Sequence, residues 1–184
     1  MGYGTVARLL HWVMAVMILV MIPVGIIMIQ EGLERATQDR LFILHKNMGT
    51  VLLALIVVRF GWRLFNPPPP LPSHMPPAMQ LASRTVHVGL YVAIAVMAAS
   101  GYARVRMGGF PIEGLDAVGI GTLLPRDDDL AETAKAVHAI TKRVLMGLIG
   151  IHVAGAAYHG IVRRDGVMRR MWPPVAPAGE RKVG

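Results

Sequence analysis

Cysteine is absent from the 184 residues, and only 16% of them are charged. Without cysteine the chain cannot form disulfides, ligate an iron–sulfur cluster through thiolates, use a thiol nucleophile or attach haem covalently. Any metal centre must therefore rely on histidine, of which there are seven. So few charges, together with 54% hydrophobic residues, also exclude an ordinary soluble domain with a charged surface. Lipid is the expected solvent for most of this surface.

Four apolar segments hold most of the hydrophobic residues, and they run from Leu9 to Ile29, Leu41 to Leu64, Val86 to Ala103 and Val137 to Val162. Each is close to the roughly 20 residues that span the hydrocarbon core of a bilayer. We therefore predict an all-α fold, an integral membrane four-helix bundle that forms a single domain over residues 1–184. The first segment lacks a small-residue cleavage site and contains His11, so we predict that it is retained rather than removed as a signal peptide.

Two connections carry clear signals. Seven prolines at positions 67–70, 72, 76 and 77 predict a stiff, extended connector between the second and third segments. The third connection, residues 104–135, is rich in glycine first and acidic later. We expect Asp129 to cap a short helix that leads into the fourth segment. The third connection has no room for a second domain.

Basic residues outnumber acidic ones by 19 to 11, which gives a net charge of +8. They lie beside the apolar segments rather than on one basic face, and this pattern indicates membrane topology rather than nucleic-acid binding. The excess is concentrated in the second connection and in the C-terminal stretch, and Lys and Arg favour the cytoplasmic side. We therefore predict that both termini are cytoplasmic.

Five of the histidines fall at two depths in this topology. His11, His87 and His152 lie toward the cytoplasm, whereas His45 and His138 lie toward the outer side. The step from 138 to 152 is fourteen residues, which keeps both histidines near one helix face with a rise of about 21 Å. The sequence therefore predicts an inner and an outer tier of imidazoles.

The same fourteen-residue step leads from His11 to Gly25 and from His87 to Gly101. At the outer tier these glycines would leave gaps that a porphyrin plane could enter. Iron held by two histidines has no open position, which favours electron transfer over oxygen binding. Hydrogen bonding between helices is the simplest alternative role for such histidines, and a zinc or copper site is another. The first leaves the matched depths unexplained, and the second needs ligands that converge on one point.

Several motifs resemble those of the bacterial cytochrome b-561 family over nearly the whole chain. They are Leu10-His11-Trp12, Leu44-His45-Lys46-Asn47-Met48-Gly49, Val57-Val58-Arg59, His87, Val137-His138, Gly150-Ile151-His152 and Tyr158-His159. The resemblance implies two haem b groups, the inner one ligated by His11 and His152 and the outer one by His45 and His138.

The resemblance also implies a multi-pass protein of the bacterial inner membrane that passes electrons to ubiquinone. Family members of this kind act as superoxide oxidases, so superoxide is the expected electron donor. An alternative is a cytochrome b anchor subunit that passes electrons to quinone from a partner dehydrogenase or hydrogenase. A transport or structural protein without haem would leave the two tiers unexplained. Membrane lipid, quinone and an electron donor are the expected partners, and nucleic acid is not.

Four further residues remain open to more than one interpretation. Depth alone would allow His87 to pair with His11, whereas the resemblance leaves His87 at the haem edge or at a propionate. Arg59 is either a positive-inside anchor or a propionate partner. His159 lies at the inner rim, where it either hydrogen-bonds a quinone headgroup or faces water. His74 lies in the proline-rich connector and is given no role.

Basic side chains on the outer side would steer an anion such as superoxide toward the outer haem. The available ones are Lys46, Arg104, Arg106, Arg126 and Lys135. The acids Asp127, Asp128, Asp129 and Glu132 oppose them and keep a redox-protein donor open as an alternative.

Overall fold

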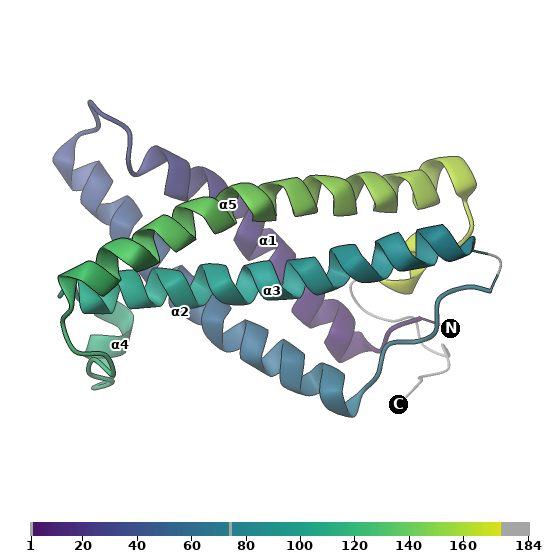
Figure 1. Cartoon of the computed structure of the whole chain (residues 1–184), viewed down its shortest axis with the longest axis horizontal. Helices are drawn as coiled ribbons and strands as arrows, with labels where there is room; N and C mark the ends of the chain where they lie inside the picture. The colour runs from purple at the N-terminus through teal and green to yellow at the C-terminus, as the bar shows by residue number, and fades with distance from the viewer. Residues whose placement is uncertain (1, 74, 174–184) are drawn as a thin grey trace. The chain divides into compact units, whose positions relative to one another are not determined.

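Helices make up all the regular secondary structure in the part of the chain that the structure describes, residues 2–73 and 75–173 of a computed structural model. The elements in chain order are α1 (Thr5–Ile27), α2 (Arg35–Phe65), α3 (Pro77–Met107), the short α4 (Glu113–Ala117), α5 (Asp128–Ala157), a π-helical turn (Tyr158–Arg163) and a 3₁₀ turn (Met168–Arg170) (Figure 1). The predicted all-α class is confirmed. His74 lies outside the described residues.

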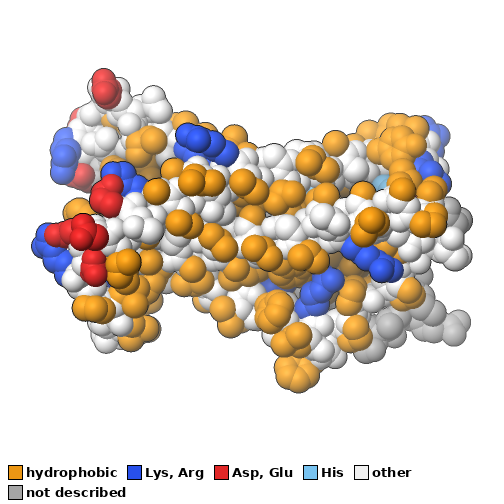
Figure 2. Space-filling model, viewed as in Figure 1, with side chains coloured by type: hydrophobic (Ala, Val, Ile, Leu, Met, Phe, Trp, Pro, Cys, Tyr) orange, Lys and Arg blue, Asp and Glu red, His pale blue; other side chains and the backbone are white. Residues whose placement is uncertain are grey.

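The four long helices, the last taken with its π-helical continuation, are long and apolar enough to cross a bilayer. Large hydrophobic side chains remain on their surfaces, and Val57, Leu64 and Ile161 each expose 65–68% of their area. Figure 2 shows hydrophobic side chains along the helices, whereas the visible acidic side chains gather at helix ends. Water would not tolerate so much exposed apolar surface, so these side chains face lipid. The four predicted spans are confirmed, and the cytoplasmic placement of both termini stays a prediction.

Three of the long helices begin well before their apolar segments. α3 begins at Pro77, which suits a first turn because its missing N–H needs no partner there. The start of α5 is capped by Asp127, whose carboxylate accepts a hydrogen bond of 2.9 Å from the backbone N–H of Leu130. The prediction that Asp129 caps a separate short helix is therefore wrong, because the cap lies two residues earlier and α5 continues without a break into the fourth span.

The proline-rich connector between α2 and α3 is non-helical, as its composition predicts. The guanidinium of Arg170 donates hydrogen bonds to the carbonyls of Pro69 and Pro70, at 2.8 and 2.7 Å. The indole of Trp12 donates to the carbonyl of Met171 at 2.9 Å. The C-terminal stretch is thus held both by the connector and by the first turns of α1.

Contacts between residues divide the chain into two compact units, and each contains segments of all four long helices. Unit 1 comprises Met1–Val13, Ile56–Ile94 and Arg143–Gly184, and unit 2 comprises Met14–Leu55 and Ala95–Lys142. Unit 1 buries Arg8 completely, and its Nε donates to the carbonyl of Tyr3 at 2.7 Å. Unit 2 has a core rich in methionine, including Met14, Met21 and Met28. The single domain over 1–184 stays a prediction.

Ion pairs hold α4 to the long helices within unit 2. The ammonium of Lys46 on α2 binds the carboxylate of Glu113 at 2.6 Å. The guanidinium of Arg106 on α3 makes two hydrogen bonds to the carboxylate of Asp116, at 2.6 and 3.3 Å. Ile112, just before α4, is only 1% exposed. This short helix was not predicted, and it binds Lys46, the residue that follows His45 in the chain.

Candidate functional site

Three histidines meet in unit 1, each from a different helix. The ring centroids of His11 on α1 and His152 on α5 lie 6.1 Å apart, and that of His87 on α3 lies 5.2 Å from His152. The Nδ1 atom of His87 lies 2.6 Å from the carbonyl oxygen of Ser83, so Nδ1 carries the proton and donates. All three residues predicted for the inner tier are therefore close together.

Two histidines face each other in unit 2. The ring centroids of His45 on α2 and His138 on α5 lie 6.3 Å apart. The Nδ1 atom of His138 donates to the carbonyl of Met97 at 3.0 Å, which fixes its tautomer and orients its ring. The Nδ1 atom of His45 is buried and has no hydrogen-bond partner among the described residues. A buried imidazole nitrogen left in this way is costly, and it marks the ring as one with a role beyond packing.

The distance between the ring centroids of two histidines shows whether one iron atom could lie between them. Two imidazoles on opposite sides of an iron have centroids about 6.3 Å apart, because a metal–nitrogen bond of about 2.0 Å and a ring radius of about 1.15 Å both count twice. His11 with His152, at 6.1 Å, and His45 with His138, at 6.3 Å, fit this separation. His87 is too close to His152, at 5.2 Å, for such an arrangement. The residues present therefore fit one six-coordinate iron in each unit.

Two glycines lie directly against the unit 2 imidazoles. A Cβ atom at Gly25 on α1 would lie 2.7 Å from Cε1 of His45, and one at Gly101 on α3 would lie 3.1 Å from Cε1 of His138. The first distance is shorter than carbon atoms tolerate, and the second is tight enough that the ring would have to shift by a few tenths of an ångström. The sequence predicted gaps for a porphyrin at these positions, and the structure shows that the missing side chains make room for the imidazole rings themselves.

Arg59 lies beside the inner histidines and is held in place by two hydrogen bonds. Its Nε donates to the hydroxyl of Tyr91 at 3.1 Å, and its Nη1 donates to the carbonyl of Ala7 at 3.2 Å, one helical turn before His11. The guanidinium of Arg63 lies 5.1 Å from the centre of the Tyr91 ring. A shallow cavity lies between these side chains, and its lining contains no acidic residue. The charge of Arg59 is therefore available near His11.

His159 is in the π-helical turn that continues α5, an irregularity that is frequent at functional sites. Its side chain is 13% exposed, and its Nδ1 lies 2.7 Å from a carboxylate oxygen of Asp165. Asp165 also accepts hydrogen bonds from Nε of Arg163, at 3.1 Å, and from the backbone N–H of Val167, at 3.2 Å. Burial raises the pKa of Asp165, but these hydrogen bonds, that of His159 foremost, outweigh it and hold the pKa below its usual range. Asp165 is thus an ionised partner for His159.

Sequence reasoning missed Asp165 and Tyr91. Asp165 reaches His159 because the chain reverses after the π-helical turn, where Arg164 has a φ of 49° and Gly166 a φ of 81°. The Arg164-Asp165-Gly166 triplet was the available signal, since Asp and Gly favour turns. Tyr91 lies four residues after His87 and hence one turn along the same face of α3.

These features together define an all-helical membrane protein with paired histidines on its spanning helices. The chain belongs to the prokaryotic cytochrome b561 family, whose sequence profile matches residues 2–174. It is similar to cytochrome b561 homolog 2 of Escherichia coli (strain K12), with 29% identity over 170 residues that cover 92% of this chain and 90% of the relative. It is also similar to the probable superoxide oxidase CybB of Yersinia pestis, with 28% identity over 169 residues that cover 89% and 92%.

Family membership establishes the general activity and the location of the protein. It is a multi-pass protein of the bacterial inner membrane that binds haem b and transfers electrons.

Proposed function

We propose that the protein holds two haem b groups and carries electrons from superoxide on the outer side of the membrane to ubiquinone on the inner side. The observation that carries this proposal is the spacing of the two histidine pairs, 6.1 Å in unit 1 and 6.3 Å in unit 2. One pair would suffice for a single haem. A second pair on the same set of spanning helices suits a protein that moves electrons from one side of a bilayer to the other.

In this proposal His11 and His152 hold the haem of unit 1, and His45 and His138 hold that of unit 2. Haem supplies a centre that accepts and releases one electron at a time. Two imidazoles per iron leave no open position for oxygen, so the histidines confine the chemistry to electron transfer. Arg59, held beside His11, offers a fixed cation to a propionate.

His159 is the proposed partner of the quinone headgroup. The short contact with Asp165 keeps the proton of Nδ1 directed at the carboxylate, so Nε2 is the nitrogen left for a ligand. The imidazole donates to a quinone oxygen when Nε2 also carries a proton, and it accepts from a quinol hydroxyl when Nε2 does not. His159 can therefore hydrogen-bond a quinone and deliver protons as it is reduced.

Superoxide is the proposed donor because one relative, whose alignment covers 89% of this chain, is named a probable superoxide oxidase. The reaction balances when two superoxide anions each lose one electron and leave as dioxygen. The two electrons and two protons convert one ubiquinone to ubiquinol. A one-electron donor and a two-electron acceptor require a protein that can pass single electrons in sequence.

The test is a pyridine haemochrome assay on the detergent-purified protein, followed by reduced-minus-oxidised spectra during exposure to enzymatically generated superoxide. We expect two haem b per chain, reduction by superoxide and reoxidation by added ubiquinone. Superoxide dismutase in a parallel sample should prevent the reduction, which controls for other reductants. One haem per chain would refute the two-haem proposal. Two haems that do not respond to superoxide would instead support an anchor subunit that receives electrons from a partner protein.

A further inference from the structure

The five basic side chains of unit 2 that could attract an anion differ in whether they form an ion pair with an acidic side chain. Four of the five cations expected to steer an anion are in ion pairs: Lys46 with Glu113, Arg106 with Asp116, Arg126 with Asp128 and Lys135 with Glu132. Arg104 is the exception. No ion pair or hydrogen bond of its side chain occurs within residues 2–73 and 75–173.

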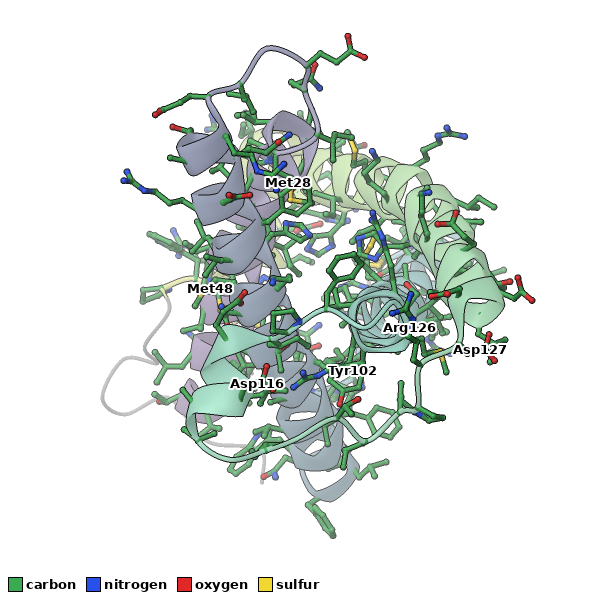
Figure 3. All side chains as sticks on the ribbon, turned by 90° about the vertical axis from the view of Figure 1, so that its left-hand side faces the viewer. Met28, Met48, Tyr102, Asp116, Arg126 and Asp127 are labelled. Atoms are coloured by element: carbon green, nitrogen blue, oxygen red, sulfur yellow. The ribbon has the colours of Figure 1, made fainter. Side chains whose placement is uncertain are left out.

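These pairings are spread around the end of unit 2. Asp116 lies on α4, and Arg126 lies in the segment just before α5, away from Asp116 (Figure 3). Hydrogen bonds from Arg106 hold the pKa of Asp116 below its usual range. Burial raises the pKa of Glu113, but hydrogen bonds from its partners, that of Lys46 foremost, bring it below the usual range. Both acids of α4 are therefore ionised near neutral pH and offset the cations that they bind.

Arg104 is also the cation best placed with respect to the histidines. On α3 it lies one turn after Ser100 and Gly101, both of which contact the ring of His138. Side chains on a helix lean toward its N-terminus, so the side chain of Arg104 leans toward this contact.

We infer that Arg104 is the binding residue for superoxide, the cation that draws this small anion to the edge of the unit 2 site. The inference rests on the proposed function, because it names the residue that receives the proposed substrate. An anion approaching these five cations meets four whose charges are largely cancelled by a paired acid, and Arg104, whose charge no acid among the described residues cancels. There superoxide would give up one electron to the haem that His45 and His138 are proposed to hold, on the way to ubiquinone. It would leave as dioxygen, which is neutral and no longer attracted by the guanidinium.

The test measures the second-order rate of reduction by superoxide in the purified protein, for wild type and for Arg104→Gln, Arg104→Lys and Arg126→Gln. The last variant changes the net charge by the same amount as Arg104→Gln but removes a cation that is already paired. At low ionic strength we expect Arg104→Gln to be about three- to tenfold slower, Arg104→Lys to be close to wild type, and Arg126→Gln to change by less than about 1.5-fold. The defect should shrink in 0.5 M salt, because the Debye length there is only about 4 Å.

Each outcome has a distinct meaning. If wild type is not reduced by superoxide, the proposed function itself fails. If wild type is reduced and Arg104→Gln matches it, or if Arg126→Gln is equally slow, the inference about Arg104 is overturned while the proposed function stands. The haemochrome assay supplies a second readout. Loss of one haem from Arg104→Gln would overturn the substrate role, because Arg104 would then be holding a haem propionate.

Discussion

Replacing Gly25 by alanine would disturb the unit 2 site without removing a proposed ligand. The new methyl group would lie 2.7 Å from Cε1 and 3.3 Å from Nδ1 of His45. Carbon atoms pack at about 3.5–4.0 Å, so the imidazole would have to move by about 1 Å. After such a movement, the ring of His45 could not keep both its orientation and its present centroid separation of 6.3 Å from His138.

The magnitude follows from two opposing effects. Overpacking a well-packed interior costs about 1–3 kcal/mol. Alanine in place of glycine within a helix returns about 1 kcal/mol, so the apoprotein should lose about 0–2 kcal/mol of stability. The displaced ring affects haem binding more directly. If the whole packing cost falls on the holo state, haem affinity at this site drops about 5- to 150-fold, since 1.4 kcal/mol is a factor of ten.

The assay is haem content per chain, with redox-difference spectra and thermal unfolding of the same samples. Two matched controls are available. A Cβ atom at Gly101 would meet His138 less severely, at 3.1 Å, whereas one at Gly147 on α5 would meet nothing within 4 Å. We expect Gly25→Ala to retain about one haem, Gly101→Ala an intermediate amount, and Gly147→Ala the wild-type amount. Full haem content with an unshifted spectrum in Gly25→Ala would refute the reasoning, and so would equal losses in Gly147→Ala.

Three further predictions concern single side chains. His138→Ala should remove about half of the haem and leave the spectrum of the unit 1 site, and loss of all haem would contradict the ligand pairing. Asp165→Asn should slow ubiquinone reduction several-fold with unchanged haem spectra, measured by stopped flow. Because the folded pKa of Asp165 lies below 3.8, the stability that its ionisation provides is present above that pH and lost as the pH falls further, which acid unfolding of wild type and variant would detect. Glu113→Gln releases Lys46 from its ion pair and should raise the low-salt rate of reduction by superoxide about twofold, whereas a slower rate would show that α4 attachment matters more than charge.

Much of the fold could be predicted because membrane spans have a strong sequence signal. Four apolar segments of the right length give four helices whatever their side-chain details. The helix starts were harder, because they depend on caps rather than on hydrophobicity. Three consecutive aspartates follow Arg126, and the sequence does not show which of them bonds the first turn. The structure assigns that bond to Asp127.

The sequence predicted at which depth each histidine of the candidate site lies, but it did not predict which side chains the histidines contact. Counting residues along a helix places His138 and His152 at two levels, and the structure confirms that the histidines of each tier lie together. Contacts between helices depend on how each helix is rotated, which counting does not reveal. The bond from His138 to the carbonyl of Met97 and the contact of Gly25 with His45 are of this kind. The short helix α4 could not be predicted for a different reason, because its five residues are too few for a periodic pattern.

The distribution of the proposed ligands over the helices also predicts how defects should spread. α5 supplies one histidine to each pair, His138 in unit 2 and His152 in unit 1, whereas the partners come from different helices, His45 from α2 and His11 from α1. A change confined to one partner, or to a glycine against it, should therefore unload one site and spare the other. A change that bends or shifts α5 should weaken both. Gly147 is therefore an informative control position, because it lies on α5 between the two histidines. An alanine there should strengthen the helix without contacting either imidazole, and both sites should keep their haem.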